Sequence, residues 1–318
     1  MTAIESIGLF VLGLVLTVKG ADWLTEGASS VARRLRVSSM VIGLTVVAVG
    51  TSAPELVVSC LSAARDQGDM AIGNVVGSNI FNTLVIAGLT ALVSPLLCSK
   101  NNIRYDVPFC LVASIALFAL TAEGSLTRWD GVLLLCFLAI FISYTFAIAR
   151  SSRSSAGALA TPPDEPPAWK TTLSLVGGLV CLALGGEWFV GGASGIARCL
   201  GVSEGVIALT IVAAGTSMPE LVTSVVAAHK GDTAMALGNV VGSNLLNIFL
   251  VLGVASCIRP LSLGSIGSVD FGTLLGAMTL LWLFCRFNDK SVRVINRWEG
   301  MLLLLCGVAY YAQAVIFA

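Results

Sequence analysis

Two short stretches of the sequence place an acidic side chain beside hydroxyl groups within apolar surroundings. Residues 50–59 read "GTSAPELVVS" and residues 215–224 read "GTSMPELVTS". In each, a glutamate (Glu55 or Glu220) follows a threonine by four positions, so one face of a helix would carry both side chains. A carboxylate inside a membrane costs roughly 3 kcal/mol, and such a residue therefore indicates a functional site.

A second doubled motif adds further oxygen atoms. "GNVVGSN" occurs at residues 73–79 and again at 238–244. With the residues that follow, it forms a polar row at every fourth position in each copy, namely Asn74, Ser78 and Asn82, then Asn239, Ser243 and Asn247. Serine and asparagine also form hydrogen bonds between membrane helices, which is the alternative interpretation of these rows.

Two prolines expose backbone oxygen atoms beside the glutamates. Pro54 and Pro219 have no N–H group, so the carbonyls of Gly50 and Gly215 lose their helical partner. Carboxylates, hydroxyls, amides and free carbonyls together make a ligand set of oxygen atoms only. Such ligands suit Ca²⁺ and, by the same logic, Na⁺, but not soft metals.

The composition predicts a membrane protein. The chain has 318 residues, of which 56% are hydrophobic and 11% charged, and its mean hydropathy is +0.93. Soluble domains carry about a quarter charged residues.

The net charge of zero argues against a nucleic-acid partner. "GNVVGSN" lacks both the G-x-G-x-x-G spacing and a P-loop lysine, so no nucleotide is expected. One histidine and scattered cysteines leave no zinc site or catalytic triad, so we expect neither an enzyme nor a cofactor.

The apolar segments predict an all-α membrane protein with about ten transmembrane helices. A span requires about 20 apolar residues. The expected spans are 4–32, 38–64, 70–97, 106–122, 129–149, 171–197, 203–228, 233–258, 268–286 and 299–317. Residues 151–170, rich in serine and proline, form the predicted linker. It separates a first five-helix unit (1–150) from a second (171–318).

Basic residues predict the orientation. With the N-terminus outside, the inner loops would hold 13 Lys and Arg residues and the outer loops 4. The positive-inside rule therefore predicts that both termini are extracytoplasmic and that the linker is cytoplasmic, in a protein of the plasma or inner membrane.

The two units are copies of one another. A fixed offset of 165 residues maps Glu55 onto Glu220, and 18 of the 30 residues from Gly50 to Asn79 are identical to those at the mapped positions. Because five spans are an odd number, the second copy would enter the membrane in the inverted orientation. Inverted repeats are typical of secondary transporters, whose binding site lies at the repeat interface near the membrane midplane.

The motifs "GTSAPELVVS" and "GTSMPELVTS", each followed by "GNVVGSN", resemble the two alpha repeats of the cation/Ca²⁺ exchanger superfamily, in particular the Na⁺/Ca²⁺ exchangers of prokaryotic type. The repeats would extend over residues 48–88 and 213–253. The resemblance implies that Glu55 and Glu220 are the central carboxylates of an ion site. It also implies the remaining ligands, with backbone carbonyls contributed near Ala48 and Ala213: Thr51, Ser52, Ser78 and Asn82, and their counterparts Thr216, Ser217, Ser243 and Asn247.

These observations predict a secondary transporter that exchanges Na⁺ for Ca²⁺ by alternating access, with electrogenic Ca²⁺ export. Exchange of Ca²⁺ for H⁺ or another cation is the alternative, and a cation channel is a further one. Some relatives have an aspartate where this chain has Asn247. Because Asn82 and Asn247 are both asparagine here, coupling to K⁺ is not favoured.

Overall fold

The computed structural model describes residues 2–155, 166–202, 207, 211, 213–264, 266–287 and 293–316, and these residues are almost entirely helical. The first half contains α1 (Ala3–Leu35), α2 (Ser39–Ile42), η1 (Gly43–Val47), α3 (Ala48–Thr51), α4 (Ala53–Ala64), α5 (Gly68–Ile80), η2 (Phe81–Ile86), α6 (Ala87–Val93), η3 (Asn102–Asp106), α7 (Val107–Leu120) and α8 (Arg128–Ser155), where η marks a π-helical segment. The second half contains α9 (Ala168–Cys199), α11 (Ala213–Gly215), α12 (Met218–His229), α13 (Thr233–Leu246), η5 (Asn247–Leu252), α14 (Gly253–Ile258), α15 (Ser268–Arg286) and α16 (Arg297–Ile316).

Seven of these helical stretches are long and apolar enough to cross a membrane, and the bent pair Ser39–Thr51 and Ala53–Ala64 makes an eighth if it counts as one span. The predicted span 203–228 lies partly outside the described residues, and the predicted span 299–317 corresponds to α16. The centre of the predicted linker, 156–165, is likewise outside them. Its two ends are helical, because α8 continues to Ser155 and α9 begins at Ala168.

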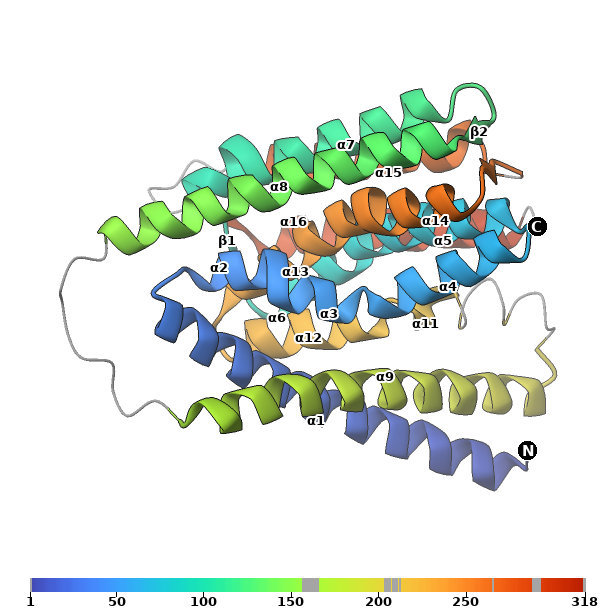
Figure 1. Cartoon of the computed structure of the whole chain (residues 1–318). Coiled ribbons are helices and arrows are strands. Elements are labelled where there is room, and N and C mark those ends of the chain that lie inside the picture. Colours follow the sequence, from blue (N-terminus) through green and yellow to red (C-terminus); the bar gives the residue numbers. More distant parts are fainter. Residues whose placement is uncertain are drawn as a thin grey trace.

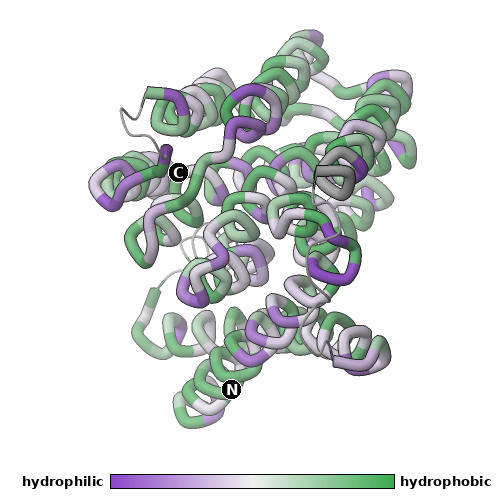
Figure 2. The backbone as a smooth tube through the Cα atoms, turned by 90° about the vertical axis from the view of Figure 1, so that its left-hand side faces the viewer, coloured by the Kyte–Doolittle hydropathy of each residue, from purple (hydrophilic) through white to green (hydrophobic). Residues whose placement is uncertain are grey.

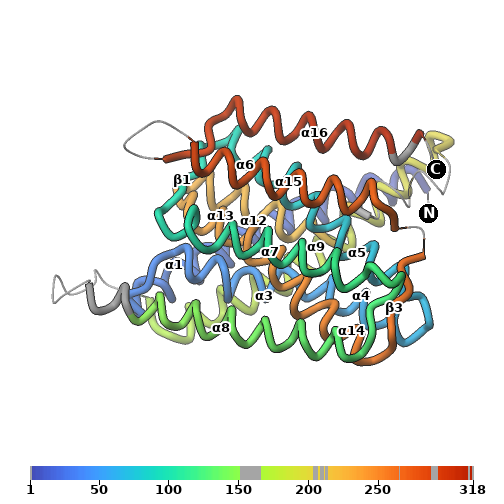
Figure 3. Tube along the Cα trace, turned by 90° about the horizontal axis from the view of Figure 1, so that it is seen from above, coloured from blue at the N-terminus to red at the C-terminus, as the bar shows by residue number. Residues whose placement is uncertain are grey.

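Two helical stretches form the centre of the molecule. These stretches are Gly68–Val93 and Thr233–Ile258, which the sequence offset relates to each other. In the most apolar 18 residues of each, 78% of the residues are buried, whereas the corresponding share in α1, α8 and α9 is near 20%. Figure 3 shows α8 and α16 at opposite edges, with α12 and α13 between them. Figure 2 shows most helices nearly end-on, with hydrophobic and hydrophilic residues interspersed. Large apolar side chains are exposed on the outer helices, for example Val15 on α1, Phe146 on α8 and Leu173 on α9, where lipid would be.

The long helices α1 and α9 pack against each other on one side of the bundle (Figure 1). Their contact is lined by glycines at seven-residue spacing, and the offset of 165 relates the two sets, Gly13, Gly20 and Gly27 on α1 and Gly178, Gly185 and Gly192 on α9. A Cβ atom at Gly20 would lie 2.8 Å from the carbonyl oxygen of Gly178. Small residues of this kind allow two membrane helices to approach closely.

Short antiparallel strand pairs connect the two halves, and the sequence analysis did not predict them. β1 (Leu96–Leu97) pairs with β4 (Val294–Ile295), and β2 (Ser125–Leu126) pairs with β3 (Leu261–Ser262). Each pair therefore joins one strand from each half of the chain.

Candidate cation-binding site

A break in the helix places each glutamate at a helix N-terminus. α3 ends at Thr51 and α4 begins at Ala53, with Pro54 in the first turn and a bend of 46° between the two segments. The same break recurs between α11, which ends at Gly215, and α12, which begins at Met218. Glu55 and Glu220 consequently lie in the first turns of α4 and α12. The unpaired N–H groups and the dipole at a helix N-terminus stabilise negative charge, so both positions suit an ionised carboxylate.

Each glutamate is contacted by a serine from the other half of the chain. The hydroxyl of Ser52 donates to Glu220 Oε1 at 3.0 Å, and the hydroxyl of Ser217 donates to Glu55 Oε1 at 3.2 Å. Both carboxylates are fully buried. The two predicted acidic residues therefore meet at a single centre between the halves, related by the same offset as the sequence repeat.

Several oxygen atoms around this centre have no partner among the described residues. In the whole described part of the protein, nine buried side-chain oxygen atoms lack a hydrogen bond. Six of the nine belong to predicted ligands: Glu55 Oε2, Glu220 Oε2, Ser78 Oγ, Asn82 Oδ1, Thr216 Oγ1 and Asn247 Oδ1. An unsatisfied buried polar atom costs about 1–3 kcal/mol. A cation bound among these atoms would satisfy them, because their lone pairs are the ligands that hard cations take.

The remaining predicted ligands form contacts within the protein. Ser243 donates to Glu220 Oε1 at 3.4 Å, and Thr51 donates to Oδ1 of Asn239 at 3.2 Å. The carbonyl of Ala48 accepts a hydrogen bond from the backbone N–H of Ser52 at 3.0 Å. Ala213 begins α11, and nothing is described of its side chain.

The flanking asparagines connect the paired helices in the same way in both halves. Asn74 Nδ2 donates to Ser59 Oγ at 3.0 Å and to the carbonyl of Glu55 at 3.4 Å. In the second half, Asn239 Nδ2 donates to Ser224 Oγ at 2.9 Å and to the carbonyl of Glu220 at 3.3 Å. These amides hold the backbone of each glutamate against the central helix beside it.

The sequence analysis missed Asn79 and Asn244, which contact the predicted ligands. Asn82 Nδ2 donates to Asn244 Oδ1 at 3.1 Å, and Asn247 Nδ2 donates to Asn79 Oδ1 at 3.0 Å. Both missed residues belong to "GNVVGSN" and are related by the repeat offset, which is the signal that singles them out. Asn82 and Asn247 lie in the π-helical segments η2 and η5, a backbone form frequent at functional sites.

A multi-helical membrane fold of this kind, with a buried oxygen-lined centre between its halves, is that of a transporter. The family model described as "Sodium/calcium exchanger protein" matches residues 5–147 and 170–316. The chain belongs to the sodium/calcium exchanger family.

Individual relatives match almost the whole chain. CaxA of Alkalimonas amylolytica is 38% identical over 324 residues, covering 98% of each chain, and the sodium/calcium exchanger MaX1 of Methanosarcina acetivorans is 33% identical, covering 95% of this chain and 96% of its own. Among solved structures, the sodium-calcium exchanger NCX_Mj soaked with Na⁺ and Sr²⁺ is similar with a TM-score of 0.83 and 34% identity. That comparison covers 98% of this chain and 99% of NCX_Mj.

Proposed function

We propose that this protein exchanges Na⁺ for Ca²⁺ across the cell membrane by alternating access, with net export of Ca²⁺. The observation that carries the proposal is the crossed pair of carboxylates: Glu55 and Glu220 come from different halves, each receives a serine hydroxyl from the other half, and each keeps one oxygen without a partner among the described residues. A cation between them would be held by both halves at once. Movement of one part of the protein past this centre would then open it to either side.

The proposed ligands are the two glutamates and the oxygen-bearing groups around them. We assign to the site the side chains of Glu55, Glu220, Thr51, Thr216, Ser52, Ser217, Ser78, Ser243, Asn82 and Asn247, and the backbone carbonyls near Ala48 and Ala213. Membership of the sodium/calcium exchanger family and the unsatisfied oxygen atoms support this assignment.

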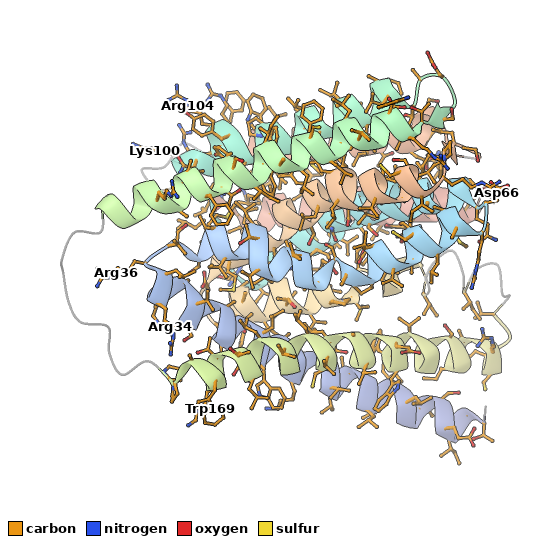
Figure 4. The ribbon with its side chains drawn as sticks, in the orientation of Figure 1. Arg34, Arg36, Asp66, Lys100, Arg104 and Trp169 are labelled. Carbon is orange, nitrogen blue, oxygen red and sulfur yellow. The ribbon has the colours of Figure 1, made fainter. Side chains whose placement is uncertain are left out.

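We further propose ten spans arranged as two inverted five-helix repeats, with both termini outside and the linker in the cytoplasm. The start of α1 and the end of α16 lie at one end of the molecule, and the end of α8 and the start of α9 lie at the other (Figure 1). Figure 4 places Arg34, Arg36, Lys100 and Arg104 at the end that carries the start of α9 and Asp66 at the opposite end. This gathering of positive charge supports a cytoplasmic assignment for that end.

The moving part is proposed to be the pair formed by α1 and α9. These helices pack closely through glycines and lie on one side of the bundle, so they can shift as a unit across the carboxylates. Lys230, at the end of α12, forms ion pairs with Asp22 at 2.5 Å and Glu26 at 3.3 Å on α1. Exposed ion pairs contribute about 0–1 kcal/mol, which is weak enough to break and re-form during a transport cycle.

Charge balance supports electrogenic exchange. Two ionised glutamates carry a total charge of about −2, which one Ca²⁺ or two Na⁺ neutralise. A third Na⁺ would leave one positive charge that moves with the membrane potential, worth about 2.3 kcal/mol per 100 mV. Exchange of three Na⁺ for one Ca²⁺ therefore uses the potential as well as the Na⁺ gradient.

A liposome experiment tests this function. Purified protein is reconstituted, Na⁺ is loaded inside, and uptake of ⁴⁵Ca²⁺ is followed after dilution into Na⁺-free buffer, with choline-loaded liposomes as the control. We expect uptake only with internal Na⁺, and faster uptake when K⁺ and valinomycin set the interior positive, because Na⁺ exit carries the extra charge.

The same liposomes separate the competing functions. Protons compete with cations for two neighbouring carboxylates, so uptake that follows a pH gradient and ignores Na⁺ would replace the proposal with H⁺/Ca²⁺ exchange. Uptake that needs no internal counter-ion would indicate a channel.

A further inference from the structure

A first chain of hydrogen bonds ends on the predicted ligand Asn247. Asn79 Nδ2 donates to the backbone carbonyl of Asn244 at 3.1 Å, and Asn79 Oδ1 accepts from Asn247 Nδ2 at 3.0 Å. All three residues are fully buried. The last atom of the chain, Asn247 Oδ1, has no partner among the described residues.

A second chain ends on Asn82. The hydroxyl of Thr83 donates to the backbone carbonyl of Asn79 at 2.8 Å, and its oxygen accepts from Asn244 Nδ2 at 2.9 Å. Asn244 Oδ1 in turn accepts from Asn82 Nδ2 at 3.1 Å. Asn82 Oδ1, at the end of this chain, also has no partner in the described part of the protein.

A backbone carbonyl sets the direction of the first chain, and in the second chain the Thr83 hydroxyl gives its one hydrogen to the carbonyl of Asn79 and therefore accepts from Asn244. A side-chain amide has an NH₂ donor on one side and an oxygen acceptor on the other, whereas a backbone carbonyl only accepts. The carbonyl of Asn244 therefore requires the NH₂ group of Asn79, and the oxygen of Asn79 then requires the NH₂ group of Asn247. Turning any one amide over would oppose two donors or two acceptors in a buried place.

We propose, on the basis of the function proposed above, that Asn79 and Asn244 are positioning residues that hold the amides of Asn247 and Asn82 with their oxygen atoms directed toward the transported cation. An amide oxygen carries partial negative charge and binds a hard cation, whereas an NH₂ group in its place would repel one. The relays therefore supply two fixed neutral ligands beside the two charged glutamates.

Asn79→Asp tests the direction of the relay. A protonated aspartic acid reproduces the amide, because its OH donates to the carbonyl of Asn244 and its C=O accepts from Asn247. The ionised form places a negative oxygen against that carbonyl and has no donor. Where the introduced carboxyl is protonated, the Ca²⁺ affinity of the variant should therefore be close to that of wild type, and where it is ionised the affinity should be about tenfold or more lower, since lost outer-shell partners cost about 10–100-fold in metal affinity.

Two comparisons complete the test. Asn79→Leu has a similar shape but no donor or acceptor at any pH, so its relative affinity should be low and independent of pH. If Asn79→Leu does not fold, Asn244→Leu tests the second relay, because it removes the acceptor of Asn82 Nδ2 and should lower the Ca²⁺ affinity in the same way.

Equilibrium binding of ⁴⁵Ca²⁺ to the purified full-length protein gives the readout, with size-exclusion profiles showing that each variant is folded. An Asn79→Leu affinity close to that of wild type, or an Asn79→Asp affinity at low pH as low as that of Asn79→Leu, would overturn the relay. This outcome is distinct from failure of the proposed function, in which wild-type protein binds Ca²⁺ but liposomes show no Na⁺-dependent uptake.

Discussion

Glu220→Gln is expected to abolish Na⁺-dependent Ca²⁺ uptake while the protein still folds. The substitution keeps the size of the side chain but leaves one negative charge where a divalent cation needs two. Unit charges 4 Å apart attract by about 4 kcal/mol at an effective dielectric constant of about 20, and about 1.4 kcal/mol corresponds to tenfold in affinity. Loss of even part of this attraction predicts a fall in uptake of more than about 100-fold, measured as the initial rate in liposomes.

Glu55→Gln should have the same effect, because Glu55 has the matching position and partner in the other half. Glu123→Gln is the matched control, since Glu123 is an exposed carboxylate between α7 and β2 and should leave uptake unchanged. Near-normal uptake by either of the two site variants would show that the cation is not held jointly.

Gly185→Ala is expected to lower both stability and transport, whereas Gly186→Ala should do neither. A Cβ atom at Gly185 would lie 2.6 Å from the backbone nitrogen of Thr17 on α1. A Cβ atom at Gly186 would have no neighbouring atom within 4 Å. Overpacking costs about 1–3 kcal/mol, which corresponds to about 1.5–4.5 °C in melting temperature for a chain of this size. Alanine is otherwise favoured over glycine in a helix by about 1 kcal/mol, so Gly186→Ala should be neutral or slightly stabilising.

Thermal unfolding in detergent and liposome uptake are measured for both variants. Because they differ by one position on the same helix, lipid exposure and helix propensity are closely matched. Equal behaviour of the two would mean that close packing of α1 on α9 is not needed for either property.

Residue types and spacing were sufficient to predict the helix breaks and the place of the glutamates beside them. A glutamate four residues after a threonine, a proline that breaks the helix, and a doubled motif at a constant offset are local features, and local geometry follows from them. The breaks at Ser52 and Ser217, and the glutamates just after them, follow from the prolines. The family is shown by the comparison of the whole chain.

Contacts between distant segments could not be predicted in the same way. Periodicity identifies which side chains share a face of one helix, but not which faces of two helices meet. The crossed contacts of Ser52 with Glu220 and of Ser217 with Glu55, and the amide relay through Asn79, depend on tertiary packing. The two-residue strand pairs are also missed by pattern, because their pairing requires both halves to be in place.

The most direct test of the shared site is a crystal structure of the protein soaked in Sr²⁺, with anomalous scattering to locate the ion. Joint binding predicts one strong peak in contact with a carboxylate oxygen of Glu55 and of Glu220 simultaneously, at distances slightly longer than the roughly 2.3–2.6 Å of Ca²⁺ ligands because Sr²⁺ is the larger ion. Separate peaks at the two glutamates, or a peak coordinated by only one of them, would contradict it.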